Sequence, residues 1–178
     1  RPFLTKLIHE NRIVAAAGMV RRECYEKAGM FPLDMPWGGD WYLWCLFAYH
    51  FDVAYLAEPL VCYRRHTSSM TYILMENDMG ACYSDDIRIP WNIKALADKD
   101  ECREVSRECL RSIAAEYARR MVGKHYKAAE SYSVMTNEQF EESLARNTAK
   151  PSEREWVRAL VYARMADQYY ERGQFALA

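Results

Sequence analysis

The sequence predicts an α/β fold over residues 1–69 and a mostly α-helical extension over residues 70–178. Up to His66, short apolar runs alternate with turn residues, a pattern typical of strands and helices that follow one another. Beyond Met70, apolar residues recur at every third or fourth position, as they do on amphipathic helices. We therefore expect two parts with different architectures.

The first part begins with an expected strand and helix. Residues 13–20 (IVAAAGMV) are apolar and uncharged, which favours a buried strand. Residues 21–28 predict a short helix that ends at Gly29, because glycine readily adopts the backbone conformation that follows a helix. Residues 31–39 hold two prolines and two glycines, and they predict a loop.

A buried helix and two strands are expected to complete this part. The run from Asp40 to Phe51 is apolar on every face after its first residue, which predicts a helix surrounded by other elements. Residues 53–56 and 60–64 predict two short strands joined through Glu58-Pro59. The expected order is thus strand, helix, loop, helix, strand, strand.

The extension carries clearer helix signals. An apolar stripe with three- and four-residue steps predicts one long helix that ends near Gly123; its members are Cys102, Val105, Cys109, Ile113, Tyr117 and Met121. Thr136 with Gln139, and Ser152 with Glu155, fit the capping box, in which a cap hydroxyl and the side chain three residues later bond each other's backbone amides. Two further helices are therefore expected to begin at these caps.

Composition narrows the class of protein. Lys and Arg total 24 and Asp and Glu total 25, so the net charge is −1 and nothing indicates binding to nucleic acid. The longest stretch without these residues, Trp41–Phe51, is shorter than the about 18 apolar residues of a membrane span. The six cysteines form no C-x-x-C pair, so we expect free thiols and a cytoplasmic location, with peripheral contact to the inner face of the membrane as an alternative.

The residues with the most chemical content surround Asp40. Three of the five tryptophans (Trp37, Trp41 and Trp44) flank this carboxylate where the loop meets the helix. Indole faces offer a flat apolar platform to a sugar ring, while a carboxylate can take a proton from a hydroxyl held beside it. The alternative is that Asp40 caps its helix and the tryptophans fill a core.

A second cluster, Tyr63-Arg64-Arg65-His66, closes the last expected strand. Two guanidinium groups and an imidazole can bind a diphosphate and ligate a divalent ion. The alternative is a solvated sheet edge.

Three motifs in series resemble a known family. They are N-R-I-V-A-A-A-G-M-V-R-R-E-C-Y-E-K-A-G-M-F (residues 11–31), W-G-G-D-W-Y-L-W (residues 37–44) and D-V-A-Y-L-A-E-P-L-V-C-Y-R-R-H (residues 52–66). Their order and spacing resemble the C-terminal, acceptor-side half of family 2 glycosyltransferases of the GT-A fold. The resemblance covers roughly the first 70 residues, and we interpret the chain as a piece of such an enzyme.

The resemblance implies inverting transfer of a sugar from a nucleotide-diphosphate donor to the hydroxyl of a glycan or lipid-linked saccharide. Asp40 falls at the position of the general base. His66 falls on a histidine near the metal, which would be Mn²⁺ or Mg²⁺, and Arg64 and Arg65 would offset charge on the leaving diphosphate. From the stacking argument we add Trp37 and Trp41 as acceptor contacts.

Two departures from the family pattern keep other functions open. Gly39 stands where the family usually has a glutamate. The donor-binding half with its D-x-D metal motif would lie upstream of Arg1, and Asp98-Lys99-Asp100, which follows the acceptor half, is interpreted as helix capping. The alternatives are a non-catalytic interaction module and a carbohydrate-binding module.

Overall fold

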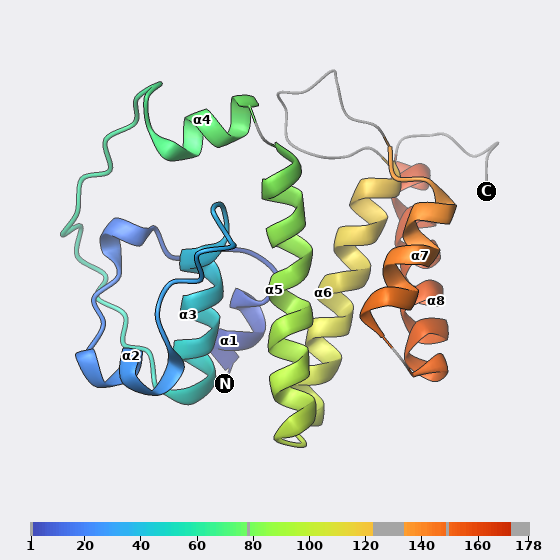
Figure 1. Cartoon of the computed structure of the whole chain (residues 1–178), viewed down its shortest axis with the longest axis horizontal. Helices are drawn as coiled ribbons and strands as arrows, with labels where there is room; N and C mark the ends of the chain where they lie inside the picture. Colours follow the sequence, from blue (N-terminus) through green and yellow to red (C-terminus); the bar gives the residue numbers. More distant parts are fainter. Residues whose placement is uncertain (1, 78, 123–133, 149, 172–178) are drawn as a thin grey trace. The chain divides into compact units, whose positions relative to one another are not determined.

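All regular elements in the described part of the chain are helices, which contradicts the predicted α/β fold. The computed structural model describes residues 2–77, 79–122, 134–148 and 150–171. Figure 1 shows helices joined by loops and turns, and no strand is present within these residues. The α-helices are α1 (Pro2–Leu7), α2 (Arg22–Ala28), α3 (Gly39–His50), α4 (Met70–Asn77), α5 (Met79–Lys99), α6 (Arg103–Val122), α7 (Asn137–Asn147) and α8 (Pro151–Glu171).

The three expected strands do not form. The first, residues 13–20, contains a single 3₁₀ turn at Ala15–Ala17, and residues 14–19 are exposed. The other two, residues 53–56 and 60–64, lie in an extended, exposed stretch. A strand is stabilised by backbone hydrogen bonds to a neighbouring strand. None of the described residues supplies such a neighbour to these segments.

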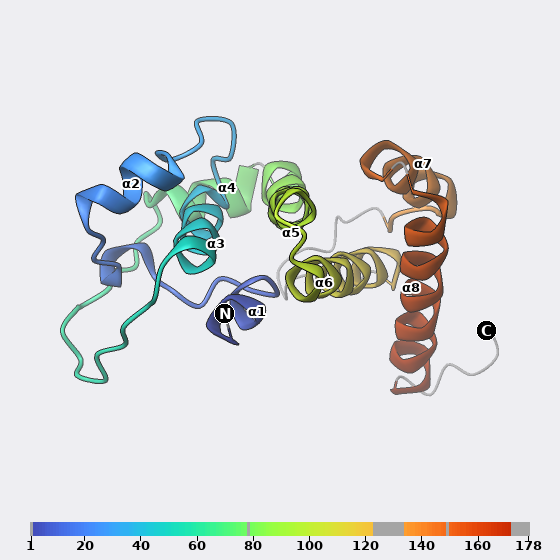
Figure 2. The same ribbon diagram turned by 90° about the horizontal axis from the view of Figure 1, so that it is seen from below.

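Contacts between residues divide the chain into two compact units, Arg1–Cys109 and Leu110–Ala178. The centre of the first unit is α3, which contacts α1, α2 and α5 (Figures 1 and 2). Most of its side chains are buried, as predicted for a helix that is apolar all round; the buried ones are Trp41, Leu43, Trp44, Cys45, Phe47, Ala48 and Tyr49. The first unit therefore has its core around α3.

Two predictions beside α3 are confirmed. The expected helix over residues 21–28 is α2, which is followed by Gly29 at a φ of 96°, a conformation that favours glycine. Residues 31–38 form the predicted loop, with turns but no helix or strand. The loop leads directly into the amino-terminal end of α3, so Trp37 and Asp40 lie close together in the sequence.

In the second unit, α7 and α8 are tied together by polar contacts. Glu141 of α7 accepts two hydrogen bonds of 2.7 Å from the Arg158 guanidinium of α8. Tyr117 of α6 packs edge-on against Phe140 at 4.9 Å between ring centroids, and its hydroxyl lies 2.8 Å from Ser143 Oγ. This unit is an assembly of helices with its own apolar contacts.

The helix signals of the extension are mostly correct. Along α6, the predicted stripe is buried from Val105 to Met121, while its predicted end at Gly123 lies outside the described residues. Thr136 and Gln139 form the full capping box. The box at Ser152 is wrong, because α8 already begins at Pro151, whose fixed φ suits the first helical position.

The cysteines and the hydropathy of the helices agree with the sequence. All six cysteines are free thiols, of which Cys45, Cys82 and Cys109 are buried. Among the helices of the described residues, none combines the length and the apolar character that crossing a bilayer requires.

Candidate functional site

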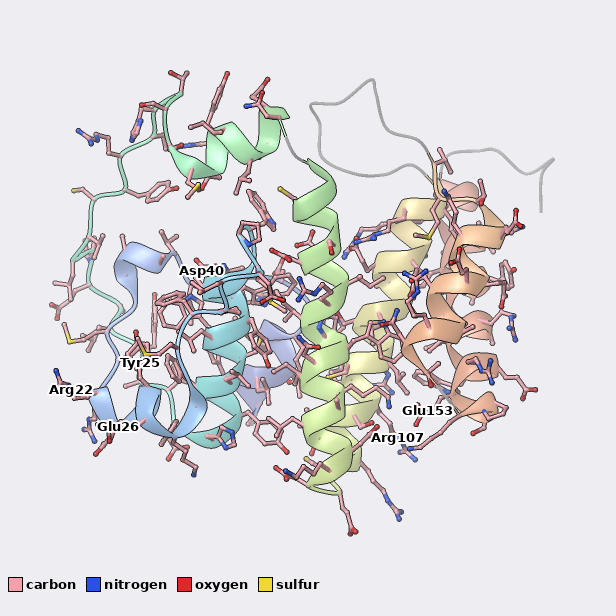
Figure 3. The ribbon with its side chains drawn as sticks, viewed as in Figure 1. Arg22, Tyr25, Glu26, Asp40, Arg107 and Glu153 are labelled. Carbon is pink, nitrogen blue, oxygen red and sulfur yellow. The ribbon has the colours of Figure 1, made fainter. Side chains whose placement is uncertain are left out.

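Asp40 lies in the first turn of α3, at the amino-terminal end of the helix (Figure 3). Its Oδ1 accepts a 2.6 Å hydrogen bond from the Trp41 backbone N–H and a 3.3 Å bond from Asn11 Nδ2. Asn11 is itself oriented, because its Oδ1 accepts the Ile13 N–H at 3.1 Å. One carboxylate oxygen is therefore fixed, and Oδ2 accepts no hydrogen bond from any other described residue.

Burial and hydrogen bonding act in opposite directions on the Asp40 carboxyl. The half-buried position raises its pKa, because partial removal from water disfavours the charged form. The hydrogen bonds from Trp41 and Asn11 lower the pKa, and burial is the larger effect. The result is a carboxylate that binds a proton more strongly than a solvated aspartate.

Trp41 belongs to the core. Its side chain is buried, and its Nε1 donates a 2.6 Å hydrogen bond to the Leu7 carbonyl in α1. The indole therefore joins α3 to α1 and has no free face for a sugar ring. This placement corresponds to the packing alternative considered for the tryptophans.

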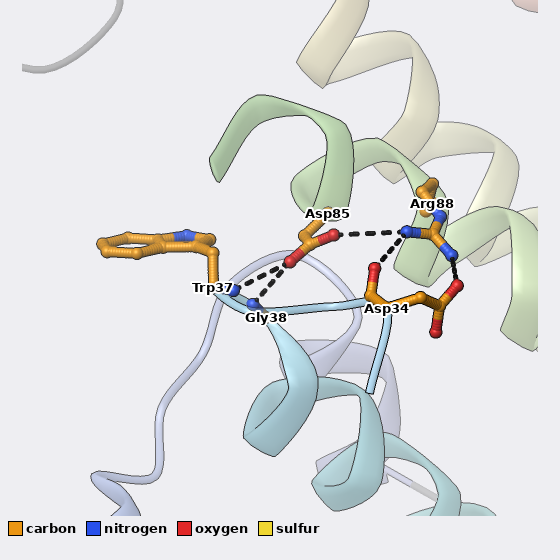
Figure 4. Close-up of polar contacts among 5 residues, drawn as sticks. All are labelled: Asp34, Trp37, Gly38, Asp85 and Arg88. Carbon is orange, nitrogen blue, oxygen red and sulfur yellow. Dashed lines mark hydrogen bonds and ion pairs between the residues drawn. The ribbon is translucent and has the colours of Figure 1, made fainter. Parts of the chain in front are cut away.

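Trp37 lies in the loop and is anchored by its backbone, as Figure 4 shows. Oδ2 of Asp85 in α5 accepts the Trp37 N–H at 3.0 Å and the Gly38 N–H at 2.9 Å. The half-buried Trp37 side chain extends away from the Asp85 carboxylate. Trp37 is therefore held by its backbone and stays partly exposed.

Arg88, one turn after Asp85, links α5 to the start of the same loop. Its Nη1 lies 3.5 Å from Asp85 Oδ1 and donates a 2.8 Å hydrogen bond to the Asp34 carbonyl. Its Nη2 forms an ion pair with the Asp34 carboxylate, and this contact lowers the pKa of Asp34. Asp34, Trp37 and Gly38 are thus all held by α5.

The second predicted cluster lies in the exposed extended stretch of residues 52–66. Arg64, Arg65 and His66 are exposed, and the His66 Nδ1 lies 2.9 Å from Ser68 Oγ. Within the described chain, no hydrogen bond or ion pair joins any of the three to Asp40. In the described residues, no polar contact therefore joins Asp40 to these three side chains.

The described residues do not fit a divalent cation. No group of three or more His, Cys, Asp or Glu side chains in that part of the chain has the arrangement of a metal site. His66 follows two arginines, whose charge opposes a cation. Asp98, in the D-x-D sequence, accepts hydrogen bonds of 2.6 Å from Lys94 and Ser106, and Asp100 accepts one of 2.9 Å from the Tyr49 hydroxyl.

Three residues of this site could not be predicted from the sequence. Asn11 is the first residue of the motif over residues 11–31, and nothing else in the sequence indicates that it contacts Asp40. Asp85 and Arg88 lie more than 40 residues after the loop that they hold, on a helix whose pattern indicates only packing. Their function becomes visible only when α5 is placed beside α3.

Comparison with known proteins adds no relative. No protein family, curated protein or solved structure matches the chain.

Proposed function

We propose that the chain forms the acceptor side of an inverting glycosyltransferase, with Asp40 as the general base. The proposal starts from the order and spacing of the three motifs over residues 11–66. The observation that carries it is the Asp40 carboxylate, which combines one fixed oxygen, a second oxygen that no other described residue hydrogen-bonds, and a raised pKa. These are properties that a base needs in order to accept a proton from a positioned hydroxyl.

The proposed chemistry is a single displacement. The acceptor hydroxyl donates its proton to Asp40 Oδ2 as its oxygen attacks the anomeric carbon of the donor sugar. The bond from that carbon to the nucleotide diphosphate breaks, and the diphosphate leaves with the electron pair. The indole of Trp37 would hold the apolar face of the acceptor sugar beside the carboxylate.

Of the other expected site residues, the proposal keeps Arg64 and Arg65 and leaves out Trp41 and His66. Arg64 and Arg65 are exposed cations that would contact the diphosphate, and the donor-binding half would be a separate, upstream part of the protein. Trp41 serves the core and is left out. Because the described residues do not fit Mn²⁺ or Mg²⁺, no step passes through a metal or through His66.

A transfer assay with the complete protein tests the role of Asp40. We expect Asp40→Asn to abolish transfer from UDP- or GDP-sugars while leaving nucleotide binding, followed by titration calorimetry, unchanged. Asparagine keeps the size and can accept the Trp41 and Asn11 hydrogen bonds, but it cannot take up the proton. Turnover that persists in this variant would remove Asp40 from the mechanism.

The same variant gives a second readout on the 178-residue chain. Because burial raises the pKa of Asp40, the folded state favours the neutral carboxyl, and ionisation at neutral pH costs stability. We expect Asp40→Asn to melt at a higher temperature than the wild type at pH 7, and this advantage should shrink as the pH falls through the raised pKa. Asp34→Asn is the control. We expect it to melt at a lower temperature than the wild type at pH 7, because Arg88 lowers the pKa of Asp34 and so favours its charged form in the folded state.

A non-catalytic module is the second candidate, and the surface of the first unit favours it. Most exposed large apolar side chains in the described residues lie between Val14 and Ile73, including Met19, Leu33 and Tyr55. Such exposure is common at sites that bind a partner.

Oligosaccharide binding that is equal with Asp or Asn at position 40, without transfer from any nucleotide sugar, would support a carbohydrate-binding module instead of an enzyme.

A further inference from the structure

The Asp85 carboxylate is an unusual feature of the first unit because it is an anion buried in the protein. Its residue is 1% exposed, and its Oδ2 accepts the two consecutive backbone N–H groups of Trp37 and Gly38. Arg88 contributes the nearest cation, at 3.5 Å from the other oxygen. Hydrogen bonds to a charged group are stronger than those between neutral groups, so this carboxylate holds the loop firmly.

The position of the two amides connects this contact to α3. Gly38 is the N-cap residue of α3 and has no side chain that could satisfy the helix end, and its carbonyl accepts the Tyr42 N–H at 2.8 Å. Asp85 therefore places a negative charge from α5 at the amino-terminal end of α3, where the helix dipole favours it. The close approach is visible in Figure 4.

We infer that Asp85, supported by Arg88, is a positioning residue that fixes Trp37 and the first turn of α3, and through that turn Asp40. Only one residue separates Gly38, whose N–H Asp85 binds, from Asp40. This inference rests on the proposed function, since it gives the proposed base and the proposed acceptor contact a common support. Asp85 itself touches no reacting atom.

The experiment measures the environment of Asp40 without requiring turnover. The pKa of the Asp40 carboxyl is determined by NMR titration of the 178-residue chain, for the wild type, for Asp85→Asn and for the double variant Asp85→Asn, Arg88→Gln. The double variant keeps the net charge of the wild type. Asp98→Asn is the matched control, because Asp98 also lies on α5 and binds Lys94 and Ser106, away from the loop.

A positioning role predicts a specific pattern. When the loop is released, water reaches Asp40, and its pKa should fall toward the ordinary value of about 3.9 in both Asp85 variants. The Asp98→Asn variant should melt at a lower temperature than the wild type but leave the Asp40 pKa unchanged. Backbone amide exchange at Trp37 and Gly38 should become faster in the Asp85 variants only.

Three results would overturn the inference. They are an unchanged Asp40 pKa in both Asp85 variants, a fall in the single variant that the double variant reverses, and an equal fall in the Asp98→Asn control. If Asp85→Asn fails to fold, Arg88→Gln decides through amide exchange: it removes the cation that supports Asp85 and should make exchange at Trp37 and Gly38 faster, and unchanged exchange there would overturn the inference. Absence of transfer by the wild-type protein would refute the proposed function, while the pKa comparison would still decide whether Asp85 controls Asp40.

Discussion

Two adjacent glycines at the start of α3 should respond in opposite ways to the same substitution. A Cβ atom on Gly38 would lie 2.7 Å from Ile89 Cδ1 and 3.0 Å from Asp85 Cβ. A Cβ atom on Gly39 would have the Pro32 carbonyl oxygen as its nearest neighbour, at 3.6 Å, which is an ordinary van der Waals distance. Gly38→Ala therefore introduces a clash with α5, and Gly39→Ala does not.

The expected cost follows from what surrounds Gly38. Ile89 is fully buried, so its methyl group must move into packed neighbours, and the Asp85 Cβ can retreat only by weakening its hydrogen bonds to the loop. Inserting a methyl group into a packed site costs about 1–3 kcal/mol. For a chain of this length each kcal/mol lowers the melting temperature by about 2–4 °C.

Thermal unfolding followed by circular dichroism compares the two variants with the wild type. Gly38→Ala should melt at a lower temperature than the wild type, by about 2–4 °C for each kcal/mol of the expected loss of about 1–3 kcal/mol. Gly39→Ala should melt at the same temperature or higher, because alanine favours a helix over glycine by up to about 1 kcal/mol. A Gly38→Ala variant as stable as Gly39→Ala would refute the close packing of α5 against the loop.

Two further predictions concern residues around α3. Gly18→Ala should destabilise the chain by about 1–3 kcal/mol in denaturant unfolding, because its Cβ would lie 2.7 Å from the buried Trp44 ring; wild-type stability would contradict this contact. Cys62 is exposed, whereas burial raises the pKa of the Cys45 and Cys109 thiols, so an alkylating reagent followed by mass spectrometry should modify Cys62 first and the other two only upon unfolding. Fast modification of Cys45 or Cys109 in the folded chain would exclude their burial.

The sequence predicted most elements whose signal is local, the capping box at Ser152 being an exception. Three helices show this. The apolar run of α3, the glycine after α2 and the Thr136 hydroxyl before α7 are signals carried by residues close together in the sequence, and each helix lies where it was expected. The strands were wrong for the opposite reason. Residues 53–56 have a strand-like composition, but a strand also needs a pairing partner, and composition does not reveal whether one is present.

In the candidate site, too, the residue with a local signal could be predicted, and the residues that act from distant positions could not. Its central carboxylate could be singled out because Asp40 stands among tryptophans at a loop-to-helix junction. Its supports could not, because the contacts from Asn11 and Asp85 span 29 and more than 40 residues of sequence. The burial of Trp41 was equally hidden, since a tryptophan that stacks on a ligand and one that fills a core have the same local pattern.

The extended stretch of residues 52–66 has a consequence for the behaviour of the isolated chain. Between residues 52 and 65 no hydrogen bond joins the backbone to any described residue, and Tyr55, Leu56 and Leu60 are largely exposed. Free amide and carbonyl groups beside apolar side chains form a template for intermolecular β pairing, the first step of aggregation. Pro59 stands in the middle of this template, where it offers no N–H and is preceded by the charged Glu58. We therefore expect Glu58 and Pro59 to disfavour edge-to-edge pairing between copies of the chain.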